Sequence, residues 1–199
     1  MTCAPSGPEH ARRNGLASRL EGQADCTRCA ALCCMAFAFD KGQGFGIDKP
    51  NSQACPHLGG DDRCQIHEDR EAAGFAACIQ YDCGGVGQYL TETVFAGAHW
   101  RGDPGLMDAM TAAFSALREI AALSELLAAA GTLPLERGDR AALEAHCVAL
   151  WPAQDWTPES LAAFEASGGA KATRQFVRSL RRYVEPGGER PVGTNGSNW

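Results

Sequence analysis

Hydrophobic positions recur at helical spacing through the second half of the chain. From residue 103 to 131 an apolar side chain returns every three or four positions, which is the period of one helix face. Asp103-Pro104 supplies a helix start, because an aspartate caps free N–H groups and proline suits the first helical position. Gly131 supplies a stop. The pattern predicts one long amphipathic helix.

Three shorter helices are predicted after it. The second opens at Asp139 and ends before Trp151-Pro152. The third starts at Thr157-Pro158 and closes at Ser167-Gly168-Gly169. The fourth covers about 170–184. Short connections favour antiparallel neighbours, so we expect a small antiparallel helical bundle over residues 88–184.

Residues 26–87 show no comparable period, because glycines and prolines interrupt them repeatedly. Loops are expected, with short helical turns over 29–37 and 68–78. A miniature core is expected from Phe37, Phe39, Phe45, Ile47, Leu58, Ile66 and Phe75. Eight of the ten cysteines lie in this stretch: Cys26, Cys29, Cys33, Cys34, Cys55, Cys64, Cys78 and Cys83.

The two ends of the chain differ from both regions. Residues 1–25 are polar and predict a mobile leader with a short helix near 16–20. Residues 185–199 are rich in Gly, Pro and Asn and predict a disordered tail. The expected fold is therefore mainly α: a loop-rich cysteine-cluster metal module over 26–87 packed on the bundle.

Composition and charge narrow the classes of partner. No run of 18 apolar residues would cross a bilayer, so no membrane partner is expected. A formal charge of −6 makes nucleic acid an unlikely partner, because phosphate contacts need clustered Lys and Arg. Basic residues gather between 171 and 190, which leaves a protein partner as one possibility beside a solvated helix face.

Such a density of cysteines indicates either metal coordination or disulfide bonds. The first residues contain no apolar segment of the secretory kind, so we expect a reducing cytoplasm, where disulfides are rare. Cys26 and Cys29 have the C-x2-C spacing that brings two sulfurs to one ion. A metal would also supply folding energy, ~10–16 kcal/mol for structural zinc. Metal is favoured, and disulfides or free redox thiols are the alternative.

The spacing also suggests how the cysteines divide. Adjacent Cys33 and Cys34 diverge in direction, so one of them should join Cys26 and Cys29 while the other faces a second site or the miniature core. All eight cysteines are candidate metal ligands, and His57 and His67 are optional ones. Zinc is slightly favoured over iron or an iron–sulfur cluster, because the spacing is not that of bacterial ferredoxins.

Three other features are judged against this cluster. Cys3 and Cys147 lie outside it and are not expected to be ligands. Residues 84–87 (Gly-Gly-Val-Gly) resemble a phosphate loop only weakly, because no Lys-Ser/Thr pair follows. We expect a turn there, whose glycines let the backbone pass close to sulfur.

Several motifs within about residues 24–85 resemble a known family. These are Cys26-x2-Cys29-x3-Cys33-Cys34, Cys55-Pro56-His57-Leu58, Cys64-x-Ile66-His67 and a later Cys78. Together they resemble the YkgJ-type cysteine-cluster family, which implies chelation of zinc or iron. Phe45-x2-Asp48-Lys49 and Gly74-Phe75-x2-Cys78-x2-Tyr81-Asp82-Cys83 are similar to the front region of certain bacterial pentapeptide-repeat proteins, although the repeats are absent here.

No Ser-His-Asp triad or paired-carboxylate arrangement is legible, so an enzyme is not favoured. We expect a cytoplasmic metal-binding protein, holding zinc or iron in its cysteine cluster and acting as a structural or interaction module. The alternative is an iron–sulfur protein with a redox, electron-transfer or enzymatic role.

Overall fold

The computed structural model describes residues 19–20, 22–103 and 105–184. Within these ranges the chain forms seven α-helices and no β-strand beyond isolated bridges. The prediction of a mainly α fold is confirmed. The predictions for the leader, the tail and Cys3 concern residues outside the described ranges. Among the described helices, none has the length and apolarity needed to cross a bilayer.

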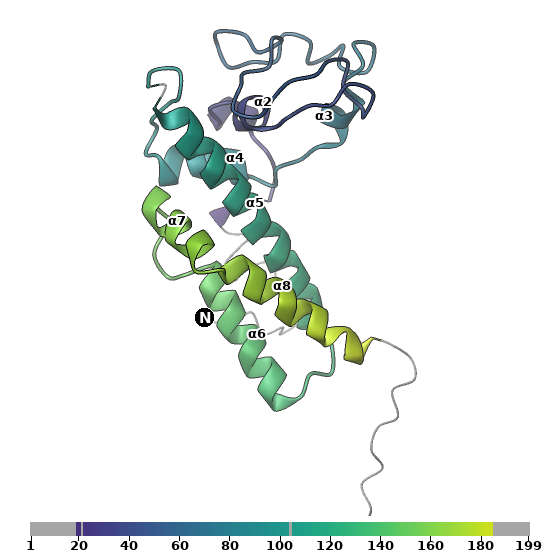
Figure 1. The fold of residues 1–199 in the computed structure, drawn as a ribbon, viewed down its shortest axis with the longest axis vertical. Coiled ribbons are helices and arrows are strands. Elements are labelled where there is room, and N and C mark those ends of the chain that lie inside the picture. Colours follow the sequence, from purple (N-terminus) through teal and green to yellow (C-terminus); the bar gives the residue numbers. More distant parts are fainter. Residues whose placement is uncertain (1–18, 21, 104, 185–199) are drawn as a thin grey trace, which may run out of the picture.

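The long helix α5 (Leu106–Ala130) is the centre of the fold (Figure 1). Helices α6 (Arg137–Leu150), α7 (Pro158–Ala166) and α8 (Gly169–Ser179) all pack against it, and a 3-10 turn (Leu180–Tyr183) extends α8. The apolar positions that predicted α5 form its buried side. They include Met110, Phe114, Leu117, Ile120, Leu123 and Leu127.

The helix starts agree with the expected signals only in part. Helix α5 begins at Leu106 with Gly105 at its N-cap, so Asp103 does not cap the helix as expected. The Asp103 carboxylate instead accepts a hydrogen bond from the Gly105 N–H at 2.9 Å, just before α5. Helix α6 begins at Arg137, slightly before the expected Asp139. At the start of α7 the Thr157 hydroxyl accepts the Ser160 N–H at 3.2 Å, and the Ser160 hydroxyl accepts the Thr157 N–H at 2.8 Å. This reciprocal pair is a capping box.

Short helical segments punctuate the cysteine-rich region. A 3-10 turn (Cys26–Arg28) and α2 (Leu32–Ala36) lie near its start, and α3 (Ala76–Gln80) lies near its end. Helix α4 (Val86–Tyr89) then runs directly into a π-helical turn (Leu90–Val94). The predicted turn over 68–78 is displaced, because residues 68–74 form successive tight turns and the helix starts only after Gly74 and Phe75.

The miniature core forms as predicted. Phe39, Phe75 and Cys55 are buried at its centre. The Phe39 and Phe45 rings stack at 4.3 Å between centroids, and Phe75 meets both edge-on at 6.4 Å. All seven predicted side chains belong to this cluster, together with Cys34 and Cys78.

A second, larger core joins the cysteine region to the bundle. Leu32 and Met35 of α2 are completely buried and pack in the same cluster as α5. The Phe37 ring lies 5.4 Å from that of Phe114, and the Trp100 indole N–H donates to the Ala30 carbonyl at 2.7 Å. The expected boundary at residue 87 falls inside α4. The larger core therefore contains residues from both sides of this boundary.

Candidate metal centre

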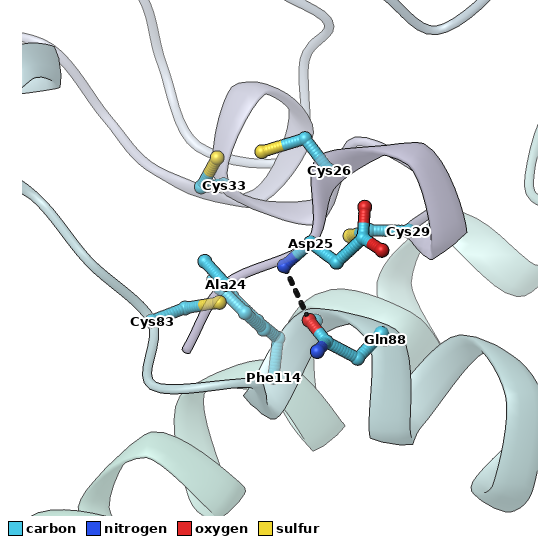
Figure 2. Close-up of a pocket in the computed structure, with 9 residues that line it drawn as sticks. Ala24, Asp25, Cys26, Cys29, Cys33, Cys83, Gln88 and Phe114 are labelled. Atoms are coloured by element: carbon cyan, nitrogen blue, oxygen red, sulfur yellow. Dashed lines mark hydrogen bonds between the residues drawn. The ribbon is translucent and has the colours of Figure 1, made fainter. Parts of the chain in front are cut away.

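Four cysteines line a small pocket at the junction of the cysteine region and α4. Cys26 and Cys29 come from the 3-10 turn and its end, Cys33 from α2, and Cys83 from the loop before α4. Figure 2 shows the sulfurs of Cys26 and Cys33 turned toward one another above Cys83. The cavity between these pocket cysteines encloses about 20 Å³, close to the space of a single water-sized group.

A buried glutamine holds the first cysteine turn in place. The Asp25 carboxylate accepts the Thr27 N–H at 2.8 Å and so caps the turn that carries Cys26. The Asp25 N–H donates to the side-chain carbonyl of Gln88 at 2.8 Å, as Figure 2 shows. The Gln88 amide in turn donates to the Gln23 carbonyl at 3.0 Å. Gln88 is only 3% exposed, and it ties this turn to α4.

Gly87 leaves room for the pocket sulfurs. A Cβ atom at this position would lie 2.6 Å from the Cys29 sulfur and 3.7 Å from the Cys83 sulfur. The expectation that a glycine of the 84–87 stretch lets the backbone pass close to sulfur is confirmed at Gly87. Gly84 and Gly85 instead make the turn, with φ of 61° and 91°.

The remaining four cysteines, Cys34, Cys55, Cys64 and Cys78, form a second group beside the miniature core. Cys34 and Cys78 pack against the cluster that contains Cys55. The Cys55 N–H donates to the Cys34 carbonyl at 3.0 Å, and a backbone bridge between Leu58 and Cys64 brings the Cys64 loop alongside. Cys33 thus lines the pocket while Cys34 packs on the miniature core, and a hydrogen bond between their side chains links the two groups.

Burial raises the pKa of several of these thiols, which favours their protonated form when no cation is present. It raises the pKa of Cys29 to about 12 and that of Cys78 to about 11, and it also raises the pKa of Cys26 and Cys55. The pKa of Cys33 is raised first by its hydrogen bond with Cys34 and then by burial. Neighbouring sulfurs raise one another's pKa further, so a cation at either group would reverse the balance.

The described residues contain eight free cysteines, the members of the two groups. In the same part of the chain, no group of three or more Cys, His, Asp or Glu side chains has a geometry that would hold a metal ion. His57 packs edge-on to Phe75 at 5.2 Å, and His67 pairs with Glu68 at the surface at 2.9 Å. Cys147 lies buried in α6, outside both groups.

Two groups of polar contacts near the cysteines were not anticipated. The role of Gln88 in holding the first cysteine turn follows only from its hydrogen bonds in the folded chain. Asp62 receives the Arg101 guanidinium at 2.7 Å and lies 2.9 Å from the His99 ring nitrogen. Arg101 also donates to the Gly59 carbonyl at 2.8 Å. These contacts fasten the loop before Cys64 to the segment that precedes α5.

Internal ion pairs reduce the basic character of the last helix. Arg174 pairs with Glu119 of α5, and Arg182 pairs with Asp139 of α6. Lys171 and Arg178 are exposed. Part of the positive charge between 171 and 182 thus serves the packing of α8 on its neighbours.

Comparison with known proteins adds one partial match. No protein-family model matches the chain, and no solved structure matches it. A segment of 97 residues, 49% of this chain, is 33% identical to the uncharacterized protein YybG of Bacillus subtilis (strain 168). The match covers 35% of that relative, so the chain is similar to about a third of a longer protein of unstated function.

Proposed function

We propose that this chain is a metal-ion-binding protein whose cysteine cluster holds zinc, or else iron, and that it acts as a structural or interaction module in the cytoplasm. The observation that carries the proposal is the pocket of four cysteines beside Gly87. Three separate segments supply the sulfurs, and a glycine stands at the one place where a side chain would strike Cys29.

The chemistry of the donors fits a soft divalent cation. Four thiolates are a common tetrahedral zinc set, with zinc–sulfur distances of about 2.3 Å. Because a thiol must lose its proton to act as a ligand, binding would release protons.

The test is elemental analysis and absorption spectroscopy of the whole chain purified without oxygen. We expect a colourless protein with zinc in a fixed ratio to protein. A brown protein with charge-transfer bands and iron would favour the iron–sulfur alternative. A protein that binds neither metal, even after its thiols are reduced and zinc is added, would refute the proposal.

Serine variants test the grouping of the ligands. Serine keeps the size of cysteine but does not ionise to a good ligand, so Cys26→Ser and Cys29→Ser should lose the same metal ion. Cys33→Ser should behave like them. Cys34→Ser should leave the pocket ion in place, because Cys34 faces the other group. Equal metal content in all four variants and the wild type would contradict the grouping.

A further inference from the structure

Lys49 is a charged side chain enclosed by the cysteine region. It is only 3% exposed. Its backbone pairs with that of Phe39 through two hydrogen bonds, at 2.8 and 2.9 Å. Its ammonium group lies 4.7 Å from the centroid of the Phe39 ring, at the centre of the miniature core. The lysine thus points inward, where lysines are rarely found.

Neutral atoms satisfy all the hydrogen-bond donors of this ammonium group. Nζ donates to the backbone carbonyls of Met35 at 3.3 Å, Pro50 at 3.1 Å and Gln53 at 2.7 Å. In the part of the chain that the structure describes, none of its hydrogen-bond partners is a carboxylate. Its geometry is therefore complete, but its positive charge has no conventional counter-ion.

Two cysteines lie next to the segments that hold this charge. Met35 directly follows Cys34, and Gln53 lies two residues before Cys55. Two of the carbonyls that bind Nζ therefore belong to the segments that carry Cys34 and Cys55. A buried cation is costly unless an anion compensates it, and thiolates are the anions within reach.

We propose that Lys49 is the built-in counter-charge of a second metal site, formed by Cys34, Cys55, Cys64 and Cys78, which binds its ion as a net anion. This inference rests on the proposed function, since it assumes that the cluster binds metal. Lys49 is a positioning residue rather than a ligand, because an ammonium group has no lone pair to give.

The charges explain why such a residue is useful. Four thiolates around one divalent cation leave a site with a net negative charge of about two. Burying that charge beside the Phe39 and Phe75 rings is unfavourable without a nearby cation. Lys49 supplies one, and its three carbonyl partners hold it between the segment of Cys34 and the loop of Cys55. The same contacts fix the spacing of these two cysteines.

The test compares the pH at which zinc leaves the protein in charge-changing variants of the whole chain. Lys49→Gln keeps a hydrogen-bond donor but loses the charge, Lys49→Arg keeps the charge, and Lys41→Gln is the control, because Lys41 is an exposed lysine of the same loop. Zinc release is followed with a chromophoric chelator during acid titration. The release step that Cys34→Ser abolishes belongs to the second site.

Loss of the charge makes the thiolates harder to form, so protons compete for them at higher pH. Lys49→Gln should move the second release step up by roughly one pH unit, as expected for the loss of a nearby opposite charge. Lys49→Arg and Lys41→Gln should leave it close to the wild-type position. An unchanged step in Lys49→Gln, with only a lower melting temperature, would overturn the proposal and leave Lys49 as a clamp on three carbonyls.

A measurement on the wild type covers the case in which Lys49→Gln does not fold. Calorimetry of zinc binding in buffers of different ionisation enthalpy counts the protons released. A site of four thiolates should release about four protons per ion at neutral pH. About two protons per ion would show a neutral site and overturn the proposal. Absence of any zinc binding would instead refute the proposed function itself.

Discussion

Replacing Gly87 with alanine tests the pocket without touching a ligand. Gly87 is the second residue of α4 and has ordinary helical backbone angles, so the backbone accepts alanine. In a helix interior this change is worth up to about 1 kcal/mol in favour of folding. The added Cβ would lie 2.6 Å from the Cys29 sulfur, well inside normal contact. Any loss in Gly87→Ala must therefore come from the sulfur.

The size of the loss depends on whether Cys29 is free to turn away. Without metal, its side chain rotates and the overlap is relieved, so the stability of the metal-free protein should change by less than about 1 kcal/mol. With metal bound, the Cys29 sulfur is fixed as a ligand, and overpacking costs about 1–3 kcal/mol. That energy corresponds to roughly a 5- to 150-fold weaker affinity for zinc.

The assay is competition for zinc against a chromophoric chelator, together with thermal unfolding of the metal-free form. Gly138→Ala is the matched control, since Gly138 is likewise the second residue of its helix, α6, and a Cβ there meets nothing within 4 Å. The control should bind zinc normally and gain a few tenths of a kcal/mol in stability. Wild-type zinc affinity in Gly87→Ala would refute the assignment of Cys29 to the pocket site.

Three further predictions address the fold. Chelating the metal should loosen residues 26–87 while most helical circular dichroism remains, because α5–α8 also pack on one another; equal loss of both would show one cooperative unit. Thr157→Ala should cost about 1 kcal/mol in thermal or denaturant unfolding through loss of the capping box, and Thr132→Ala is a control at an exposed position; equal effects would argue against the cap. Burial lowers the pKa of His146 below 6.5 in the folded state, so the stability that neutral His146 contributes is present above pH 6.5 and is lost as the pH falls through the folded pKa. His146→Gln should therefore reduce the drop in melting temperature over this pH range. An unchanged drop would mean that other groups cause it.

Local signals in the sequence were sufficient for the helical half of the protein. The helix from Leu106 to Ala130 and the start of α7 at Pro158 follow from apolar spacing and capping residues, which act within a few positions of each other. The miniature core could also be predicted, because the few aromatic residues of the cysteine region have little else to pack against. The divergence of Cys33 and Cys34 was a local steric argument. Cys33 lines the pocket and Cys34 packs on the miniature core, although their side chains still hydrogen-bond to each other.

The tertiary structure alone decided which distant segments meet. Cys83 joins the pocket of Cys26 because the turn at Gly84 and Gly85 folds α4 back under the first cysteines, and no spacing rule relates positions so far apart. The same holds for the single apolar core that crosses the expected boundary at residue 87. Nothing local in the sequence predicts the burial of Lys49, because that burial depends on carbonyls that only the folded chain assembles around its ammonium group.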